Sequence, residues 1–433
     1  MPRAFPVSLA AGSLLAALLL VLAACSSDLP APAEPALATL TGYAVLPADT
    51  YAPGPVVGTA LEGEINGRTP PFASPPVQGF SSLVPLPGGD WLALQDNGFG
   101  TLANSPDYPL RWYRLALDFD AGTVAVRGVV DIRDPGRVLP FPLSHADSSG
   151  LLTGADLDPE SCAPLPDGTF WIGEEFGPSL VHVGPDGTVL EKPVDVPIVP
   201  ALRDYARGSP YYRTPDHRDL RGMRHDDMRD GLANQPRSGG IEGLAVNRSG
   251  TRIYAAVEKG LRDDPVGGRR VILEFDPAHR NFTGRSWLYL ADGPDISLAS
   301  LEAFDDRHLL VLERDTAEGR DAVVKRIYRV ELGRVDQAGF LQKMLVCDLL
   351  NIADDRHLTR RERGAIGLGE HFALPFVTPE CLVVLDDATL LVANDNNFPM
   401  SSGRRPPRTP DDNEFIRIRL HTPLPADPGV ARN

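Results

Sequence analysis

The sequence predicts an all-β protein folded as a β-propeller of six blades joined by long loops. The chain of 433 residues contains 42 prolines and 41 glycines, which is more than average usage predicts and favours many turns. Its short apolar runs alternate with Gly, Pro and Asp turns, and no window shows a long helical period with caps. One strand-turn-strand unit also recurs along the chain, as in repeat architectures.

The N-terminal segment predicts export. Residues 1–24 place Arg3 before an almost unbroken apolar stretch, which is typical of a lipoprotein signal peptide. The stretch ends in Leu22-Ala23-Ala24-Cys25, which resembles a bacterial lipobox and makes Cys25 the expected lipidation site. A membrane-spanning anchor is the alternative. A lipid-anchored protein would lie in the bacterial cell envelope, at the outer membrane or the periplasmic face, with the membrane as its partner.

The mature chain divides into three parts by composition. Residues 25–36 are rich in Ser, Pro and Ala and predict a flexible tether. Residues 37–425 would form the propeller, and residues 426–433 a C-terminal tail. The three cysteines of the propeller are widely spaced, without a zinc or disulfide pattern, and are expected to be buried free thiols: Cys162, Cys347 and Cys381.

The charge balance excludes one class of partner. The chain carries 58 acidic and 42 basic side chains, a formal net charge of −16. Such a chain repels phosphate backbones, so it is not expected to bind nucleic acid. An anionic substrate would need local cations.

Five candidate hairpins share one pattern. A two-residue turn would set Glu160 opposite Glu175 across Asp167-Gly168. The same reasoning sets Ser81 opposite Asp96 and Glu380 opposite Asp395, whereas the hairpin at Glu242 needs a bulge or a three-residue loop. Acidic residues would therefore collect at the open ends of hairpins that start at Ser81, Glu160, Glu242, Ala299 and Glu380.

Further strands complete four-stranded blades. A second pair of candidate strands follows most hairpins, and four strands per unit is typical of a propeller blade. The hairpins start 57 to 82 residues apart, which predicts long loops between blades. Five hairpins are visible and a sixth blade is inferred. Residues 415–420 are expected to close the ring with strands from residues 37–67, which removes a free sheet edge.

Paired carboxylates need an explanation, because like charges directly opposite on antiparallel strands destabilise the pair. They persist when a cation neutralises them, when one of them is protonated, or when water screens both. The last case describes a wet propeller rim without function. Carboxylate oxygens, with Asn97 and Asn396 contributing, are ligands that calcium or magnesium prefers, and calcium is the expected cofactor.

Several ordered motifs resemble those of the phytase-like family, described as having esterase-like activity of phytase. The resemblance covers roughly residues 75–420 and implies a β-propeller. The family's usual Glu-Gly pair after Pro379 is Glu380-Cys381 here. The motifs are Asp96-Asn97-Gly98-Phe99-Gly100, Glu174-Glu175-Phe176-Gly177-Pro178, Gly240-Ile241-Glu242-Gly243-Leu244-Ala245, Glu313-Arg314-Asp315 and Asn394-Asp395-Asn396-Asn397-Phe398.

The resemblance implies hydrolysis of a small-molecule ester or phosphate ester at a bound divalent cation. Such a cation polarises the ester and lowers the pKa of a bound water. Glu175 is the candidate general base, and Glu242 is a candidate for both catalysis and cation binding. The expected cation or water ligands are Asp96, Glu160, Glu242, Glu380 and Asp395.

Three arginines are candidates for binding an anionic group of the substrate. Arg314 lies between Glu313 and Asp315, where it would either neutralise acids or contact the substrate. Arg404 and Arg405 belong to the one compact basic cluster, which is either a phosphate site or a mobile loop. A serine-esterase mechanism is disfavoured, because no Gly-x-Ser-x-Gly motif occurs.

Two other functions fit the same residues. A non-catalytic propeller could bind a ligand or a protein, with the acidic residues holding a structural cation. A lactonase of the gluconolactonase type would also place carboxylate and asparagine ligands around one cation. The oligomeric state is not predicted.

Overall fold

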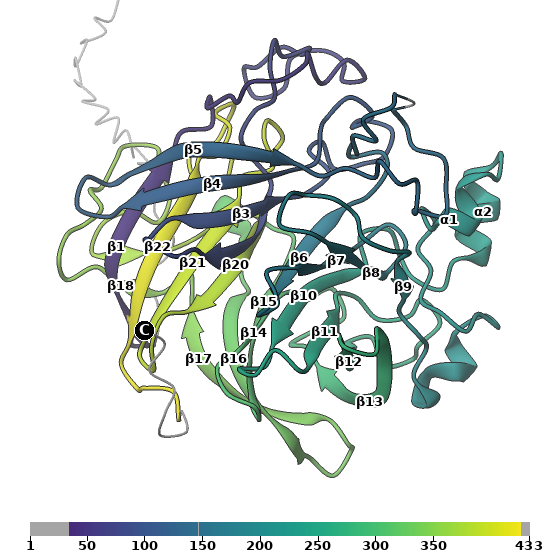
Figure 1. The fold of residues 1–433 in the computed structure, drawn as a ribbon. Coiled ribbons are helices and arrows are strands. Elements are labelled where there is room, and N and C mark those ends of the chain that lie inside the picture. Colours follow the sequence, from purple (N-terminus) through teal and green to yellow (C-terminus); the bar gives the residue numbers. More distant parts are fainter. Residues whose placement is uncertain (1–33, 146, 426–433) are drawn as a thin grey trace, which may run out of the picture.

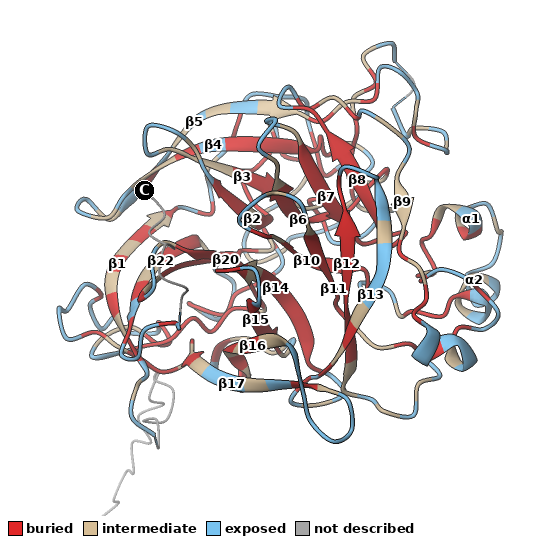
Figure 2. Cartoon of the chain, turned by 60° about the horizontal axis from the view of Figure 1, so that its bottom comes forward, coloured by how far each residue is buried: buried red, intermediate tan, exposed pale blue. Residues whose placement is uncertain are grey.

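A computed structural model describes residues 34–145 and 147–425, which form an almost entirely β protein. The predicted signal peptide, the lipidation site Cys25, most of the tether and the C-terminal tail lie outside these residues. Five four-stranded units surround a central axis. Figure 2 shows their inner strands gathered at the centre and their outer strands at the periphery.

Each of four units is an antiparallel meander of consecutive strands, from the inner strand outward (Figure 1). We call each unit a blade. The first four blades are β2 (Phe80–Pro85), β3 (Trp91–Gln95), β4 (Arg111–Asp118) and β5 (Thr123–Asp131); β6 (Pro159–Pro164), β7 (Phe170–Glu174), β8 (Ser179–Val183) and β9 (Val194–Asp195); β10 (Ile241–Val246), β11 (Ile253–Val257), β12 (Arg269–Asp276) and β13 (Asn281–Leu290); β14 (Ser297–Ala303), β15 (His308–Arg314), β16 (Lys325–Val335) and β17 (Leu341–Asp348).

The fifth blade joins the two ends of the described chain. It consists of β20 (Thr378–Val384), β21 (Thr389–Asp395), β22 (Asn413–Leu420) and β1 (Ala38–Leu46). β1 pairs antiparallel with β22 from Ala38 to Leu46, and a single pairing to β5 links this blade to the first. The predicted ring closure by residues 415–420 is therefore confirmed.

Short elements fill the long connections between blades. They are β18 (Ile352–Ala353), β19 (His371–Phe372), η1 (Pro200–Tyr205), α1 (Arg218–Arg221), α2 (Asp226–Leu232) and η2 (Gly319–Asp321). In the described part of the chain, no helix is long and apolar enough to cross a membrane.

Five apolar cores lie between neighbouring blades, one for each interface. Alternate residues of a strand point to opposite faces of its sheet, so each blade serves two cores. Trp171 of β7 packs toward the third blade and Ile172 toward the first. Ile253 and Tyr254 of β11 divide in the same way between the second and fourth blades. Apolar burial thus holds each blade from both sides.

The predicted sixth blade is wrong for the residues that the structure describes. The inner strands β2, β6, β10, β14 and β20 each contact the next, and β20 contacts β2, so five units close the ring. The fifth core, between the last blade and the first, includes Phe80 of β2 and Phe415 of β22. The repeats visible in the sequence are therefore the whole ring.

Removing residues 34–46 tests the closure. Without β1, the edge of β22 loses its partner and two cores lose Ala38, Leu40, Ala44 and Leu46. We expect the melting temperature to fall by roughly 10 °C or more. Thermal unfolding followed by circular dichroism measures the change. A truncation that ends before residue 34 is the control, and equal melting temperatures for the two truncations would contradict the closure.

Candidate active site

A β-bulge sits at the start of every inner strand. In β6, Pro159 pairs with Glu174 and Ser161 with Gly173, which leaves Glu160 without a partner on the neighbouring strand. Glu242 of β10 and Glu380 of β20 occupy the same bulge position. A bulge bends the strand and redirects a side chain. The repeated bulge therefore gives the three glutamates one common setting.

The predicted register of the hairpins, in which Glu160 pairs with Glu175, is wrong. Both the length of the turn and the bulge differ from what was expected. Leu165 donates to the carbonyl of Thr169 and Gly168 to the carbonyl of Leu165, so a three-residue loop closes the hairpin. The loop and the bulge together shift the register, so Glu160 lies beside Glu175 but is not paired with it across the two strands. The other two predicted pairs, Ser81 with Asp96 and Glu380 with Asp395, are wrong for the same reason. The bulge expected at Glu242 is confirmed.

The open ends of the hairpins nevertheless bring acidic residues together at the centre. We call this set the acidic ring. Seven of its eight members are buried and Asp96 is partly exposed. It contains every expected carboxylate and adds Asp158 and Glu258, which the sequence reasoning did not select. The members are Asp96, Asp158, Glu160, Glu175, Glu242, Glu258, Glu380 and Asp395.

Three groups of carboxylates in the ring have the spacing of a metal site, with one oxygen from each residue within 4.8 Å of the others. Glu160, Glu175 and Glu242 each belong to two groups, so the groups share ligands. Asp96 and Asp395 belong to none of the groups; they accept hydrogen bonds from the backbone N–H groups of Gly98 and Asn397, respectively. The groups are Asp158–Glu160–Glu175, Glu160–Glu242–Glu380 and Glu175–Glu242–Glu258.

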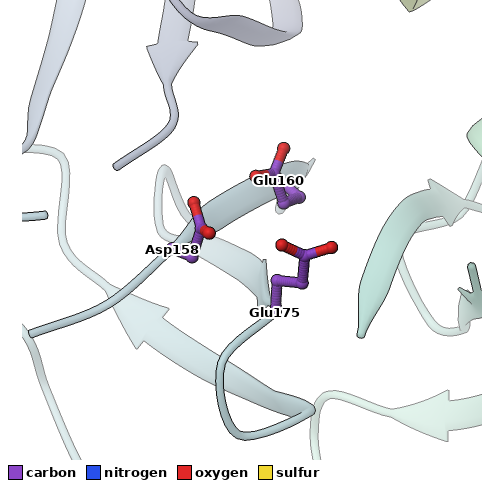
Figure 3. Close-up of side chains that lie close together, drawn as sticks. All are labelled: Asp158, Glu160 and Glu175. Carbon is purple, nitrogen blue, oxygen red and sulfur yellow. The ribbon is translucent and has the colours of Figure 1, made fainter. Parts of the chain in front are cut away.

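The group of Asp158, Glu160 and Glu175 comes from one blade and is shown in Figure 3. Asp158 precedes β6, Glu160 lies on it, and Glu175 follows β7. Asp158 accepts hydrogen bonds from the backbone and side-chain amides of Asn97 at 3.1 and 2.6 Å. Among the described residues, no arginine or lysine forms an ion pair with any of the three carboxylates. This group therefore has no counter-ion in direct contact among the described residues, unlike Glu242, Glu258 and Glu380.

Arg314 occupies the other half of the acidic ring. Its Nη2 lies 3.1 Å from Glu242 Oε1, 3.6 Å from Glu258 Oε1 and 3.5 Å from Glu380 Oε1. Lys259 adds a contact of 3.4 Å between its Nζ and Glu258. Arg314 thus neutralises the ring from within, which is one of the two roles expected for it, and its buried Nε keeps no partner in the described structure.

Several oxygens in the ring lack hydrogen-bond donors. Within the described residues, Glu242 Oε2 and both oxygens of Glu258 are buried and accept no hydrogen bond. A buried carboxylate oxygen without a donor is costly, since it has lost its water and gained nothing in return. Glu242 Oε2 and Glu258 Oε2 are therefore suited to a cation or a bound water, whereas Glu258 Oε1 already has Lys259 and Arg314 within 3.6 Å.

Burial and mutual repulsion shift the ring's ionisation. Burial raises the pKa of Glu160, Glu175 and Glu242 well above the usual range, and neighbouring carboxylates raise it further for Glu160 and Glu175. Burial also raises the pKa of Asp395 to about 6. The pKa of Glu258 is lowered, because Lys259 and Arg314 outweigh the effect of burial. Without a cation, most carboxyl groups of the ring therefore bind protons more readily than exposed carboxyl groups do.

Glu174 fixes the segments that carry the second blade's carboxylates. Its oxygens accept hydrogen bonds from the backbone N–H groups of Asp158, Phe176 and Gly177 at 3.3, 3.0 and 2.8 Å. The third blade also approaches closely, because a Cβ on Gly240 would lie 2.4 Å from the Cα of Glu175. The carboxylates of the ring are therefore held by a rigid backbone.

The two remaining candidate arginines contact acids of their own. Arg404 is fully buried and binds both oxygens of Glu414, at 2.8 and 2.6 Å. Arg405 binds Glu362 with Nε and Nη2, both at 3.0 Å. The structure therefore does not leave the Arg404 guanidinium open to a substrate, because Glu414 and the carbonyl of Ile366 occupy it.

A comparison with known protein families shows to which family this chain belongs. The family model described as phytase-like, esterase-like activity of phytase, matches residues 75–398. The chain belongs to the phytase-like family. The match includes all eight carboxylates of the acidic ring and Arg314, so the ring is built within the part of the chain that the family shares.

Other relatives are more distant. An uncharacterized secreted protein of Arthroderma benhamiae is 28% identical over 129 residues, which are 28% of this chain and 24% of the relative. Among solved structures, the calcium-binding protein regucalcin from Agrobacterium tumefaciens is 12% identical over 80% of this chain and 93% of its own, with a TM-score of 0.36. A putative 6-phosphogluconolactonase from Bacteroides uniformis is 12% identical over 75% and 66%, with a TM-score of 0.30.

Arg404→Met tests the structural role of this arginine. The variant leaves the buried Glu414 carboxylate without its partner. We therefore expect the free energy of unfolding to fall by about 3–5 kcal/mol. Adding Glu414→Gln removes the unpaired charge and recovers part of that loss. Urea unfolding measures both effects. If Arg404 instead contacted the substrate, Arg404→Met would leave the free energy of unfolding unchanged.

The pH dependence of the chelated protein tests the ionisation of the ring. Burial raises the pKa of Glu174 from 4.5 to about 7, in the same direction as its neighbours. The native state then binds more protons than the unfolded state, so stability falls as the pH rises from about 5 to about 7.5. Urea unfolding in excess chelator measures this slope, and a free energy of unfolding that rises over that range contradicts it.

Proposed function

We propose that this chain is an exported, lipid-anchored hydrolase of the phytase-like family that cleaves a small ester with the help of a calcium ion in the acidic ring. One observation carries the proposal: Asp158, Glu160 and Glu175 lie within cation-binding distance of one another and are paired with no basic side chain in the described structure. The predicted signal peptide supports export, as does the secreted relative.

The donor set favours calcium. The group offers only carboxylate oxygens, which suit hard cations, and it contains neither histidine nor cysteine. Calcium also tolerates irregular coordination, with carboxylates binding through one or two oxygens. Asp158 and Glu160 are therefore assigned as ligands. Glu175 joins them, because its carboxylate belongs to the same group.

The remaining residues of the ring would handle the proton. A bound cation supplies polarisation of the ester carbonyl and a lower pKa for water. Glu242 is the base, because its Oε2 is free of donors while Oε1 is held by Arg314 at 3.1 Å. Burial raises its pKa, which brings a carboxylate closer to the operating pH of a general base.

The charge of the ring favours a neutral ester over a phosphate monoester. Eight carboxyl groups face two cationic side chains, Arg314 and Lys259. One or two divalent cations would not reverse the sign of this site, so a dianionic phosphate would meet repulsion. A carboxylic ester or a lactone carries no such charge and is the preferred substrate class.

A second candidate is a propeller that binds calcium for stability and a ligand elsewhere. The burial of seven of the eight carboxylates favours it, because a buried cation can be structural. An experiment can distinguish the two functions, because a purely structural cation raises the stability of the fold but supports no ester hydrolysis.

Titration of the chelated, signal-free protein with calcium tests both. If the native state holds the ion, the melting temperature rises with calcium as mass action requires. Hydrolysis of p-nitrophenyl acetate in the same samples should rise in parallel, and p-nitrophenyl phosphate should be hydrolysed at least tenfold more slowly. Stabilisation without turnover supports the structural candidate. No response of stability or activity contradicts the cation site.

Glu160→Gln locates the ion. It removes a ligand charge and one source of repulsion, so we expect the chelated variant to melt at or above the wild-type temperature while the stabilisation by calcium shrinks. Ester hydrolysis should fall about 100-fold or more, since removal of a residue that only supports a metal ligand already costs roughly 10- to 100-fold. Glu62→Gln, at an exposed carboxylate, is the matched control. A variant that keeps its calcium response would place the ion elsewhere.

A further inference from the structure

A narrow channel runs along the axis of the ring, on the hairpin-turn side of the carboxylates. Its volume is about 210 Å³, and all five inner strands contribute to its wall. The wall is formed mainly by leucines and valines such as Leu83, Leu244, Val246 and Leu382, together with four serines and Glu302. Beyond the acidic ring, the centre is therefore lined mainly by apolar side chains, and Glu302 is the one charged residue in the channel wall.

The inner end of the channel is lined by residues at or next to the bulge positions of the inner strands, although by none of the eight ring carboxylates. Ser81 lines the channel and holds the same bulge position in β2 that Glu160 holds in β6. Ser161, also in the wall, directly follows Glu160. The Ser81 hydroxyl is buried and has no hydrogen-bond partner in the described structure. A polar atom thus marks the boundary between the carboxylates and the apolar wall.

The outer end opens at the hairpin turns. Pro85 is exposed, and Pro164 and Val246 are half-buried. The four residue steps from Ser81 to Pro85 span roughly 13 Å at about 3.3 Å per residue. The channel is smaller than the roughly 300 Å³ of ordinary ligand pockets. A volume of about 210 Å³ spread over this length fits one slender chain.

We propose that this channel binds the unbranched aliphatic chain of a neutral ester, with the ester group at the acidic ring and the chain pointing toward the hairpin turns. The inference rests on the proposed function and names its substrate class. The apolar wall would take up the chain through burial of its methylene groups. The Ser81 hydroxyl would donate a hydrogen bond to an oxygen of the ester.

Chain-length profiles with calcium present test the proposal. Wild-type protein should prefer p-nitrophenyl hexanoate to p-nitrophenyl acetate in kcat/KM. Val246→Phe narrows the channel and should reverse this preference by at least tenfold, mainly through the hexanoate. Ser82→Leu fills the channel from another strand and should act in the same direction. Val129→Phe, at an exposed position on β5, is the control and should leave the profile unchanged.

A binding measurement keeps the inference separate from turnover. Ligand-observed NMR with 2-octanone, a ketone that cannot be hydrolysed, should show binding to wild-type protein and to Val129→Phe but not to Val246→Phe or Ser82→Leu. Binding without hydrolysis of any ester supports the channel and rejects the proposed function. Hydrolysis with the same chain-length profile in all variants, or ketone binding that survives both channel variants, overturns the channel.

Discussion

The burial of like charges at the axis of the ring is the constraint on which the rest of this structure depends. Seven buried carboxylates and the partly exposed Asp96 would repel one another strongly in a flexible chain. They stay together because each is carried by a blade that apolar cores hold on both sides. The free energy that places the acids comes from burial of leucine, valine and aromatic side chains in the cores between the blades.

Arg314 limits the repulsion without removing it. A guanidinium within 3.6 Å of three carboxylates neutralises Glu242, Glu258 and Glu380, while Asp158, Glu160 and Glu175 keep no basic partner in the described structure. Arginine is suited to this place, because it stays charged when buried. The ring thus contains three carboxylates with a permanent counter-ion and three others that are open to an exchangeable one.

Sequence patterns predicted the strands, the hairpins and the closing strand well, because these depend on apolar periodicity and on turn residues. The register and the sixth blade were wrong for physical reasons. A three-residue loop and a bulge are hard to recognise in a sequence, yet together they shift the register so that Glu160 does not pair with Glu175. Asp158 was missed because it precedes its strand, although it lies two residues from Glu160. Arg404 lies in a basic cluster that was predicted to be a phosphate site or a mobile loop, but its guanidinium pairs with Glu414, ten residues away.

The same bulge explains why a regular ring can hold an asymmetric site. Three blades place a glutamate at the bulge, whereas the first and fourth blades place Ser81 and Ala299 there. A glutamate at all five positions would add two more buried charges that Arg314 does not contact, which the fold would have to offset by protonation or by more cations. Small side chains at two positions instead leave space beside the carboxylates, and the apolar channel reaches the acidic ring at Ser81. The five blades repeat the same backbone and differ at the bulge position of the inner strand. This difference separates the charged part of the centre from its mainly apolar part.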